Sequence, residues 1–324
     1  MKKILLLLIS VSMLLVGCGK GSDEVLKKLN AKLDIGSYYM EGKLEIVNND
    51  DTYQYDVNVS YKKDDNFKVS LNNTINNHQQ IILKNADGVY VLTPSLNKSF
   101  KFQSDWPYNN SQIYLIQNII DDINNDKDRT METVDKIYVI TSKVNYTNNP
   151  NLKKQKVYID KNMDIKKVEV IDAENTVLMK MEFNKIEMNH NFDDSYFKLE
   201  TSLNVDAETN FKESIDKVIF PLYIPSNTFL ESQNVLDTET GERAILTFKG
   251  DKPFMLFEET VSPEDKMISM YGDPIMVGDT YGAINDTSLT WYSNGLEYYI
   301  VADKLSQSEI VSIANSIGSV AVSK

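Results

Sequence analysis

Apolar and polar residues alternate along most of the chain between residues 38 and 190. The alternation is regular in runs such as Tyr53–Tyr61 and Phe67–Leu71. A period of two is typical of β-strands with one face in a core, and Asp87-Gly88 is a strong hairpin turn. The sequence predicts a long antiparallel sheet with one face in water. Its strands are expected to start at Tyr38 and to include residues 44–46, 53–61, 67–71, 80–83, 88–93, 98–102, 137–140, 156–160, 166–171 and 177–186.

Two segments show helical spacing instead of alternation. Apolar residues within Asp23–Leu33 recur every three or four positions, which predicts a short amphipathic helix. The isoleucines of Ser111–Ile123 follow the same spacing behind a possible Ser111 cap. Both helices are expected to cover the packed face of the sheet, so that residues 24–200 form one mainly β domain of the α+β class.

The polar stretch 201–210 is expected to be a linker, and most prolines of the chain follow it. Residues 211–324 are predicted to form a small α+β domain. Its final helix has a capping box made by Ser306 and Glu309 and a stop at Gly318. The strands expected in this domain are residues 244–248, 254–258, 289–292 and 297–301.

The N-terminus has the layout of a secretory signal peptide over residues 1–17. Lys2 and Lys3 precede an apolar run that is shorter than the roughly 20 residues a membrane-spanning helix needs. Leu15-Val16-Gly17-Cys18 resembles a bacterial lipobox, in which the cysteine is diacylated and becomes the first mature residue. We therefore expect Cys18 to anchor the chain to the outer face of the cytoplasmic membrane, with residues 18–23 as a flexible lipidated tether.

Acylation of Cys18 would use the only cysteine in the chain. That excludes a disulfide, a thiolate zinc site and a cysteine nucleophile. Loss of Lys2 and Lys3 with the signal peptide changes the net charge from −13 to −15. So acidic a protein is repelled by phosphate backbones and anionic headgroups, which argues against binding to nucleic acid and against electrostatic adhesion to membranes.

Candidate chemistry is sparse. His78 and His190, the only two histidines, lie in polar surroundings without a nucleophile motif and are expected to be surface residues. The acidic run Asp121–Asp128 offers oxygen ligands for calcium but lacks the central glycine and final glutamate of an EF-hand loop. A solvent-exposed turn at the end of a helix explains this run better. The pairs Asp50-Asp51 and Asp193-Asp194 fit turns. The sequence thus predicts no catalytic residues, no metal and no cofactor.

Aromatic residues are the remaining candidates for binding. The inner face of a curved sheet is either a packed core, which is the default, or an apolar cavity that takes a ligand. The aromatic residues that could line such a cavity are Tyr38, Tyr39, Tyr53, Tyr55, Phe67, Trp106 and Tyr114.

Residues 144–199 resemble the second half of the LolA-like lipoproteins of spore-forming Gram-positive bacteria, in particular the GerS-type germination lipoproteins. The match covers Gln155–Lys161, Lys167–Val170 and the closing Phe192, Asp193 and Phe197. Residues 220–225, Phe-Pro-Leu-Tyr-Ile-Pro, approximate the opening of a module appended to many such proteins. GerS itself resembles only the first domain.

The resemblance implies a half-open antiparallel β-barrel covered by helices and without catalysis of its own. LolA carriers hold acyl chains on the concave face, whereas GerS binds and activates a cell-wall amidase. A protein fixed by its own lipid cannot ferry cargo between membranes, which favours a protein partner, such as an amidase or another envelope protein, docked on an edge strand or on the barrel rim. A lipid- or lipoprotein-binding carrier is the alternative, and a hydrolase using His78 or His190 is a third hypothesis.

Overall fold

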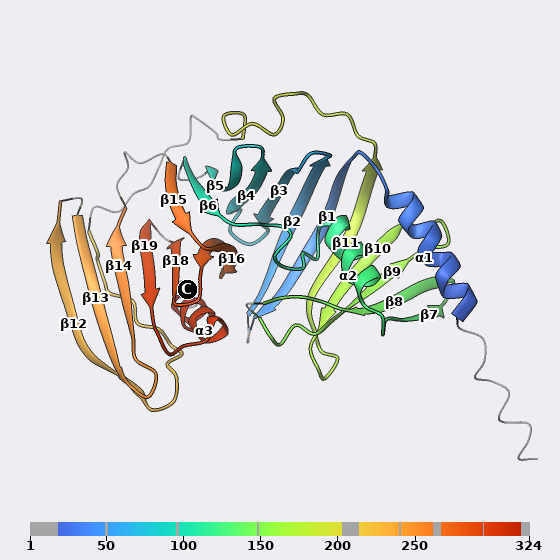
Figure 1. The fold of residues 1–324 in the computed structure, drawn as a ribbon. Helices are drawn as coiled ribbons and strands as arrows, with labels where there is room; N and C mark the ends of the chain where they lie inside the picture. The colour runs from blue at the N-terminus through green and yellow to red at the C-terminus, as the bar shows by residue number, and fades with distance from the viewer. Residues whose placement is uncertain are drawn as a thin grey trace, which may run out of the picture.

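The computed structural model describes residues 19–48, 51–94, 97–147, 149–202, 214–239, 241–261, 267–293 and 295–318. Within these ranges the protein is mostly β, with strands in two sheets and few helices (Figure 1). The predicted linker and the lipidation site Cys18 lie largely or wholly outside the described residues.

The first sheet has twelve strands in the order β15-β6-β5-β4-β3-β2-β1-β11-β10-β9-β8-β7. It is open, because its end strands β15 and β7 are not paired with each other. The half-open barrel therefore stays a prediction. The elements before residue 200 are α1 (Gly19–Leu33), β1 (Ser37–Asn48), β2 (Asp51–Lys62), β3 (Asn66–Asn73), β4 (Gln79–Asn85), β5 (Gly88–Thr93), β6 (Lys98–Gln103), α2 (Ile116–Asn125), β7 (Thr130–Val134), β8 (Ile137–Lys143), β9 (Lys154–Ile159), β10 (Ile165–Ile171) and β11 (Val177–Met188).

The second sheet has seven strands in the order β12-β13-β14-β19-β18-β17-β16. One face of it packs against the C-terminal helix α3. Its separation from the first sheet as a domain of its own, with the boundaries expected from the sequence, stays a prediction. The elements after residue 200 are β12 (Thr228–Thr238), β13 (Gly241–Gly250), β14 (Phe254–Thr260), β15 (Met267–Tyr271), β16 (Asp273–Val277), β17 (Thr280–Ile284), β18 (Ser288–Ser293), β19 (Leu296–Val301) and α3 (Gln307–Gly318).

The alternation in the sequence corresponds to the burial of alternate side chains. In β3 the residues Phe67, Val69 and Leu71 are buried while the residues between them are half-buried. All the strands predicted before residue 190 are present, and neighbouring ones from β1 to β6 pair antiparallel. The antiparallel meander is therefore confirmed over this region.

Both predicted helices cover the inner face of the first sheet, but they begin elsewhere. Helix α1 begins at Gly19, so residues 19–22, expected to be a flexible tether, form its first turn. Helix α2 begins at Ile116, and no side chain caps it. The prediction of a Ser111 cap is wrong, because the Ser111 hydroxyl accepts the backbone N–H of Asn145 at 2.7 Å instead.

The outer face of the first sheet is not entirely in water. Over β4 and β5, the side chains of Ile81, Leu83 and Leu92 are buried beneath the segment after β11, through Phe192 and Phe197. The prediction of one wet face is wrong at this place, because residues 192–199 fold back over it.

The two sheets are joined by β15. This strand pairs in parallel with β6, from Met267 opposite Ser99 to Tyr271 opposite Gln103, although it belongs to the predicted second domain. The chain then enters the second sheet at Asp273. The capping box of α3 is confirmed, since the Ser306 N–H donates to the Glu309 carboxylate at 3.1 Å.

We predict that Gly42→Ala destabilises the fold. Gly42 lies at a register shift between β1 and β11, where an added Cβ would overlap the carbonyl oxygen of Glu182. Overpacking of this kind costs about 2 kcal/mol. Gly36→Ala is the matched control, because nothing lies within 4 Å of a Cβ there. Urea unfolding should show a lower free energy of unfolding for Gly42→Ala and a change within about 0.5 kcal/mol for Gly36→Ala. Equal stabilities of the two variants would contradict the prediction.

Candidate functional site

A cavity of about 250 Å³ lies where the two sheets meet. The first sheet contributes Leu44 and Met179 to its wall, whereas β16 contributes Ile275 and Met276. None of the residues that line it is Asp, Glu, Lys, Arg or His, although the chain has a net charge of −13. We name it the junction cavity. An uncharged wall of aliphatic, tyrosine and amide side chains suits an uncharged ligand or part of one.

Tyrosine hydroxyl groups gather beside the junction cavity. The hydroxyl oxygens of Tyr114 and Tyr281 are 3.4 Å apart, and the Tyr55 hydroxyl donates to the carbonyl of Gly278 at 3.3 Å. Burial raises the pKa of Tyr114 to about 12 and that of Tyr281 well above its usual value. The hydroxyls therefore stay neutral at physiological pH, and the cavity keeps its uncharged character.

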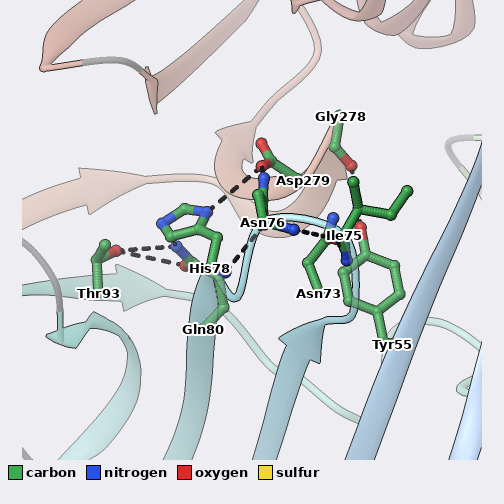
Figure 2. Close-up of polar contacts among 9 residues, drawn as sticks. All are labelled: Tyr55, Asn73, Ile75, Asn76, His78, Gln80, Thr93, Gly278 and Asp279. Atoms are coloured by element: carbon green, nitrogen blue, oxygen red, sulfur yellow. Dashed lines mark hydrogen bonds and ion pairs between the residues drawn. The ribbon is translucent and has the colours of Figure 1, made fainter. Parts of the chain in front are cut away.

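The turn Gly278-Asp279, between β16 and β17, holds the second sheet to the first. Figure 2 shows it facing the loop between β3 and β4: the Asn76 amide donates to Asp279 at 2.6 Å, and Nδ1 of His78 lies 3.6 Å from the same oxygen. The nearby His78 imidazole, followed by the Asn76 amide, lowers the pKa of Asp279 against the effect of burial. The ionised form of Asp279 is therefore favoured at this contact.

Helix α3 holds the same turn from the other side. The Gly278 N–H donates to the Asn315 side-chain oxygen at 2.9 Å. Gly278 has a φ of 59°, in the left-handed region that favours glycine. The turn therefore ties together β2, the β3–β4 loop and α3.

Exposed large apolar side chains gather on one segment of the chain. Of the fourteen found among the described residues, eight lie between residues 220 and 236. They occupy the stretch that enters the second sheet and the strand β12, which is the outer edge of that sheet, on the side of the molecule away from α1 (Figure 1). We name this surface the apolar edge; it consists of Phe220, Leu222, Tyr223, Ile224, Phe229, Leu230, Val235 and Leu236.

A buried carboxyl group positions the start of the apolar edge. Glu258 on β14 is fully buried, and its two oxygens accept the Ile219 N–H at 2.9 and 3.2 Å. Loss of hydration raises the pKa of Glu258 to about 7, and the Ile219 N–H opposes that rise. Nearby, the Ile215 N–H donates to Glu242 at 2.7 Å. These bonds fix the backbone immediately before Phe220.

The side chains of both histidines are partly exposed, and each contacts a neighbouring carboxylate. His78 lies at the junction turn described above, where its side chain also contacts Gln80. His190 contacts Glu187 at 2.7 Å, and its ring lies against those of Tyr39 and Phe192. Neither imidazole is hydrogen-bonded to a serine, threonine or cysteine side chain among the described residues.

The acidic run after α2 forms the turn in which the chain leaves this helix. Asp126 accepts the backbone N–H groups of Lys143 at 2.8 Å and Asp128 at 3.0 Å, as turn residues do. No group of three or more His, Cys, Asp and Glu side chains in the described ranges could hold a metal ion.

Most of the aromatic candidates are in the core. Tyr38, Tyr55, Phe67, Trp106 and Tyr114 are buried in the main hydrophobic cluster, so the inner face of the first sheet is a packed core where they lie. Tyr39 is on the opposite face, against the cluster of Phe192 and Phe197. Of the seven, Tyr53 and Tyr114 line the junction cavity.

The junction cavity and the apolar edge were not predicted. The cavity combines side chains from Leu44 to Asn315, which no local pattern connects. The apolar edge had one signal, the Phe-Pro-Leu-Tyr-Ile-Pro run at residues 220–225, which exposes several large apolar groups in a row. The helices in the described part of the chain include none that is long and apolar enough to span a bilayer.

By its architecture the chain is a mostly β protein of two open sheets. It belongs to the family of YdcC-like sporulation proteins, whose sequence profile matches residues 1–197. It is 35% identical over 314 residues to the sporulation protein YdcC of Bacillus subtilis strain 168, a match that covers 94% of this chain and 93% of the relative. The predicted kinship with proteins of spore-forming bacteria is thereby confirmed.

Solved structures match the chain more distantly. The complex of the CwlD amidase with the GerS lipoprotein from Clostridioides difficile matches with 18% identity and a TM-score of 0.29, over 53% of this chain and 94% of the matched chain. A LolA-superfamily protein from Nitrosomonas europaea matches with 12% identity and a TM-score of 0.31, over 55% of this chain and 98% of that one.

We predict that Glu258→Gln changes how stability depends on pH. The pKa of this carboxyl is raised from 4.5 to about 7, so between these values the folded protein keeps a proton that the unfolded chain releases. Glu258 therefore lowers the free energy of unfolding as the pH rises through this window, by on the order of 3 kcal/mol. A glutamine has no such charge and still accepts the Ile219 N–H.

Urea unfolding of both proteins at about pH 5 and about pH 8 tests this. The free energy of unfolding of the variant, relative to the natural protein, should be higher at the upper pH. Glu242→Gln is the control, since its half-buried carboxylate also accepts a backbone N–H. An equal difference at both pH values for Glu258→Gln would contradict the prediction.

Proposed function

We propose that the protein is a non-enzymatic lipoprotein, anchored in the membrane, that binds a protein partner in cell-envelope or spore-cortex processing during sporulation or germination. The observation that carries this proposal is the apolar edge. Eight large apolar side chains are exposed within 17 residues of the chain, and a concentration of exposed apolar groups in a monomeric protein commonly marks a binding surface. Membership of the YdcC-like family supports a role in sporulation.

The anchor in this proposal is a diacylglyceryl group on Cys18. It is supported by the basic start, the apolar run and the Leu-Val-Gly-Cys tetrad at residues 15–18. Two acyl chains hold a protein stably on a bilayer, whereas one chain does so only marginally. The folded part of the chain would then lie outside the cytoplasm, on the outer face of the cytoplasmic membrane.

The partner in this proposal is an envelope protein, with a cell-wall amidase as one candidate. The resemblance of residues 144–199 to GerS-type lipoproteins supports that class. A protein held on the membrane by its own lipid can recruit and position such a partner at the cell surface without chemistry of its own.

A lipid- or lipoprotein-binding carrier is the second candidate function. The junction cavity favours it, because its wall has no charged residue and includes aliphatic side chains from both sheets. Native mass spectrometry would then show a mass of lipid size in addition to the acyl groups on Cys18, with no protein partner. Absence of a bound mass of lipid size would contradict the carrier function.

We predict that the mature protein starts at Cys18 and carries two acyl chains on it. Intact mass spectrometry of protein from its own host's membranes should show the loss of residues 1–17 and the added diacylglyceryl mass. Cys18→Ser should lack the added mass, because the thiol is the acceptor. A natural protein that carries no acyl mass would contradict the anchor.

We also predict that Leu222→Ser releases the partner. Leu222 is 70% exposed on the apolar edge, whereas Ile75, at 72%, is exposed elsewhere and serves as the control. Native mass spectrometry of gently purified membrane complexes should show a stoichiometric envelope protein with the natural protein and with Ile75→Ser. Leu222→Ser should lower that occupancy by at least about tenfold, a change of about 1.4 kcal/mol. Equal losses in both variants would contradict the assignment of the surface.

A further inference from the structure

Strand β12 is the longest edge strand that the two sheets present. It has eleven residues, whereas the other end strands, β7, β15 and β16, have five each. Among the described strands only β13 pairs with it, and the other edge of β12 faces no described strand. Most of its side chains are exposed on both faces.

Strand β12 has few of the features that usually keep an exposed edge strand from pairing with another chain. It contains no lysine and no proline, whereas the opposite edge, β16, contains Pro274. A bulge lies between Leu230 and Ser232, and the register with β13 is regular from there to Thr238. A regular, unprotected edge of this length can accept another strand.

The side chains of β12 would meet both faces of an added strand. Val235 lies opposite Ala244 on β13, and Leu236, its neighbour on the other face, lies opposite Arg243. Both are about half exposed. On the face of Leu236, the row of Asn234 continues across the sheet through Ile245, Phe257 and Tyr299, whereas Leu236 itself lies in the row of Arg243. An added strand with apolar side chains would therefore contact Val235 on one face and Leu236 on the other.

The charged side chains of β12 itself and of the turn that follows it are all acidic. From Val218 to Glu242 the chain has no Lys, Arg or His but has Glu231, Asp237, Glu239 and Glu242. Glu231 is ion-paired with Lys249 on the sheet, whereas Asp237 lies at the end of β12, Glu239 in the turn after it and Glu242 at the start of β13. A second copy of this chain would bring the same carboxylates and a net charge of −13 to the contact, which disfavours self-association.

We propose that β12 binds an extended segment of the partner protein as an added β-strand, and that this segment has apolar side chains at its centre and Lys or Arg at the end that meets Asp237 and Glu239. The main-chain groups would supply hydrogen bonds, and Val235 and Leu236 would select the apolar centre. The carboxylates would select the basic end. This inference rests on the proposed function and specifies how its surface binds.

A synthetic peptide of alternating valine and threonine, with lysines at both ends, tests it with the full-length protein in detergent. Fluorescence anisotropy should show saturable binding that weakens with salt. Leu236→Lys places a charge on the edge and should weaken binding by at least about tenfold. Val134→Lys on β7 is the matched control, because Val134 is 50% exposed and Leu236 is 51% exposed.

Infrared spectra of the peptide labelled with ¹³C at its carbonyls should show β-strand pairing on binding. Three results would overturn the proposal: a bound peptide that stays unstructured, equal loss in the two variants, or equal binding of a peptide with glutamates in place of the lysines. Circular dichroism of each variant checks that it is folded, and Val235→Lys gives a second, independent test of the same edge.

Photocrosslinking in host membranes separates this inference from the proposed function. A crosslinker at Gln233 should reach the envelope protein seen by native mass spectrometry, and one at Val134 should not. If that protein is present but is not crosslinked from Gln233, the proposal that β12 binds an added strand is contradicted, whereas the proposed function still stands. If no envelope protein is present, the proposed function fails. Crosslinks between two copies of this chain would assign β12 to self-association and overturn the inference.

Discussion

The pairing of β15 with β6 sets where the second sheet lies against the first. Five residue pairs form this parallel contact, and at its end the Ser104 hydroxyl donates to Asp273 at 2.7 Å. Beside it the rings of Phe100 on β6 and Tyr292 on β18 lie 4.5 Å apart. Because main-chain bonds fix the register, the turn at Gly278-Asp279 arrives opposite Tyr55 and His78. The junction cavity exists only in that register.

The same connection leaves the far side of the second sheet in solvent. Strand β16, which follows β15 directly, lies at one end of that sheet, and β12 lies at the other. Helix α3 and residues 215–219 cover one face of it, yet no described element covers the edge of β12. The junction cavity has no charged residue in its wall.

The strands with one buried face could be predicted, because burial of alternate side chains requires an alternating sequence. Strand β12 could not, since most of its side chains are exposed on both faces and it therefore shows no period. Strand β17 was missed for the opposite reason, because all five of its residues are buried. The partner of β15 lies more than 160 residues earlier in the chain, and single-sequence patterns carry no information about such a pairing. The contact of His78 with Asp279 depends on that pairing, so it could not be predicted from the sequence either.

The position of α1 relates the proposed anchor to the proposed docking surface. Helix α1 begins one residue after Cys18, and its Val25, Leu26 and Leu29 are buried against the first sheet. An acyl group on Cys18 would therefore hold the first sheet close to the bilayer, with no long tether between them. Strand β12 lies on the side of the molecule away from α1 (Figure 1). A partner strand on β12 would then be held at a distance from the membrane set by the two sheets and by the contacts that join them.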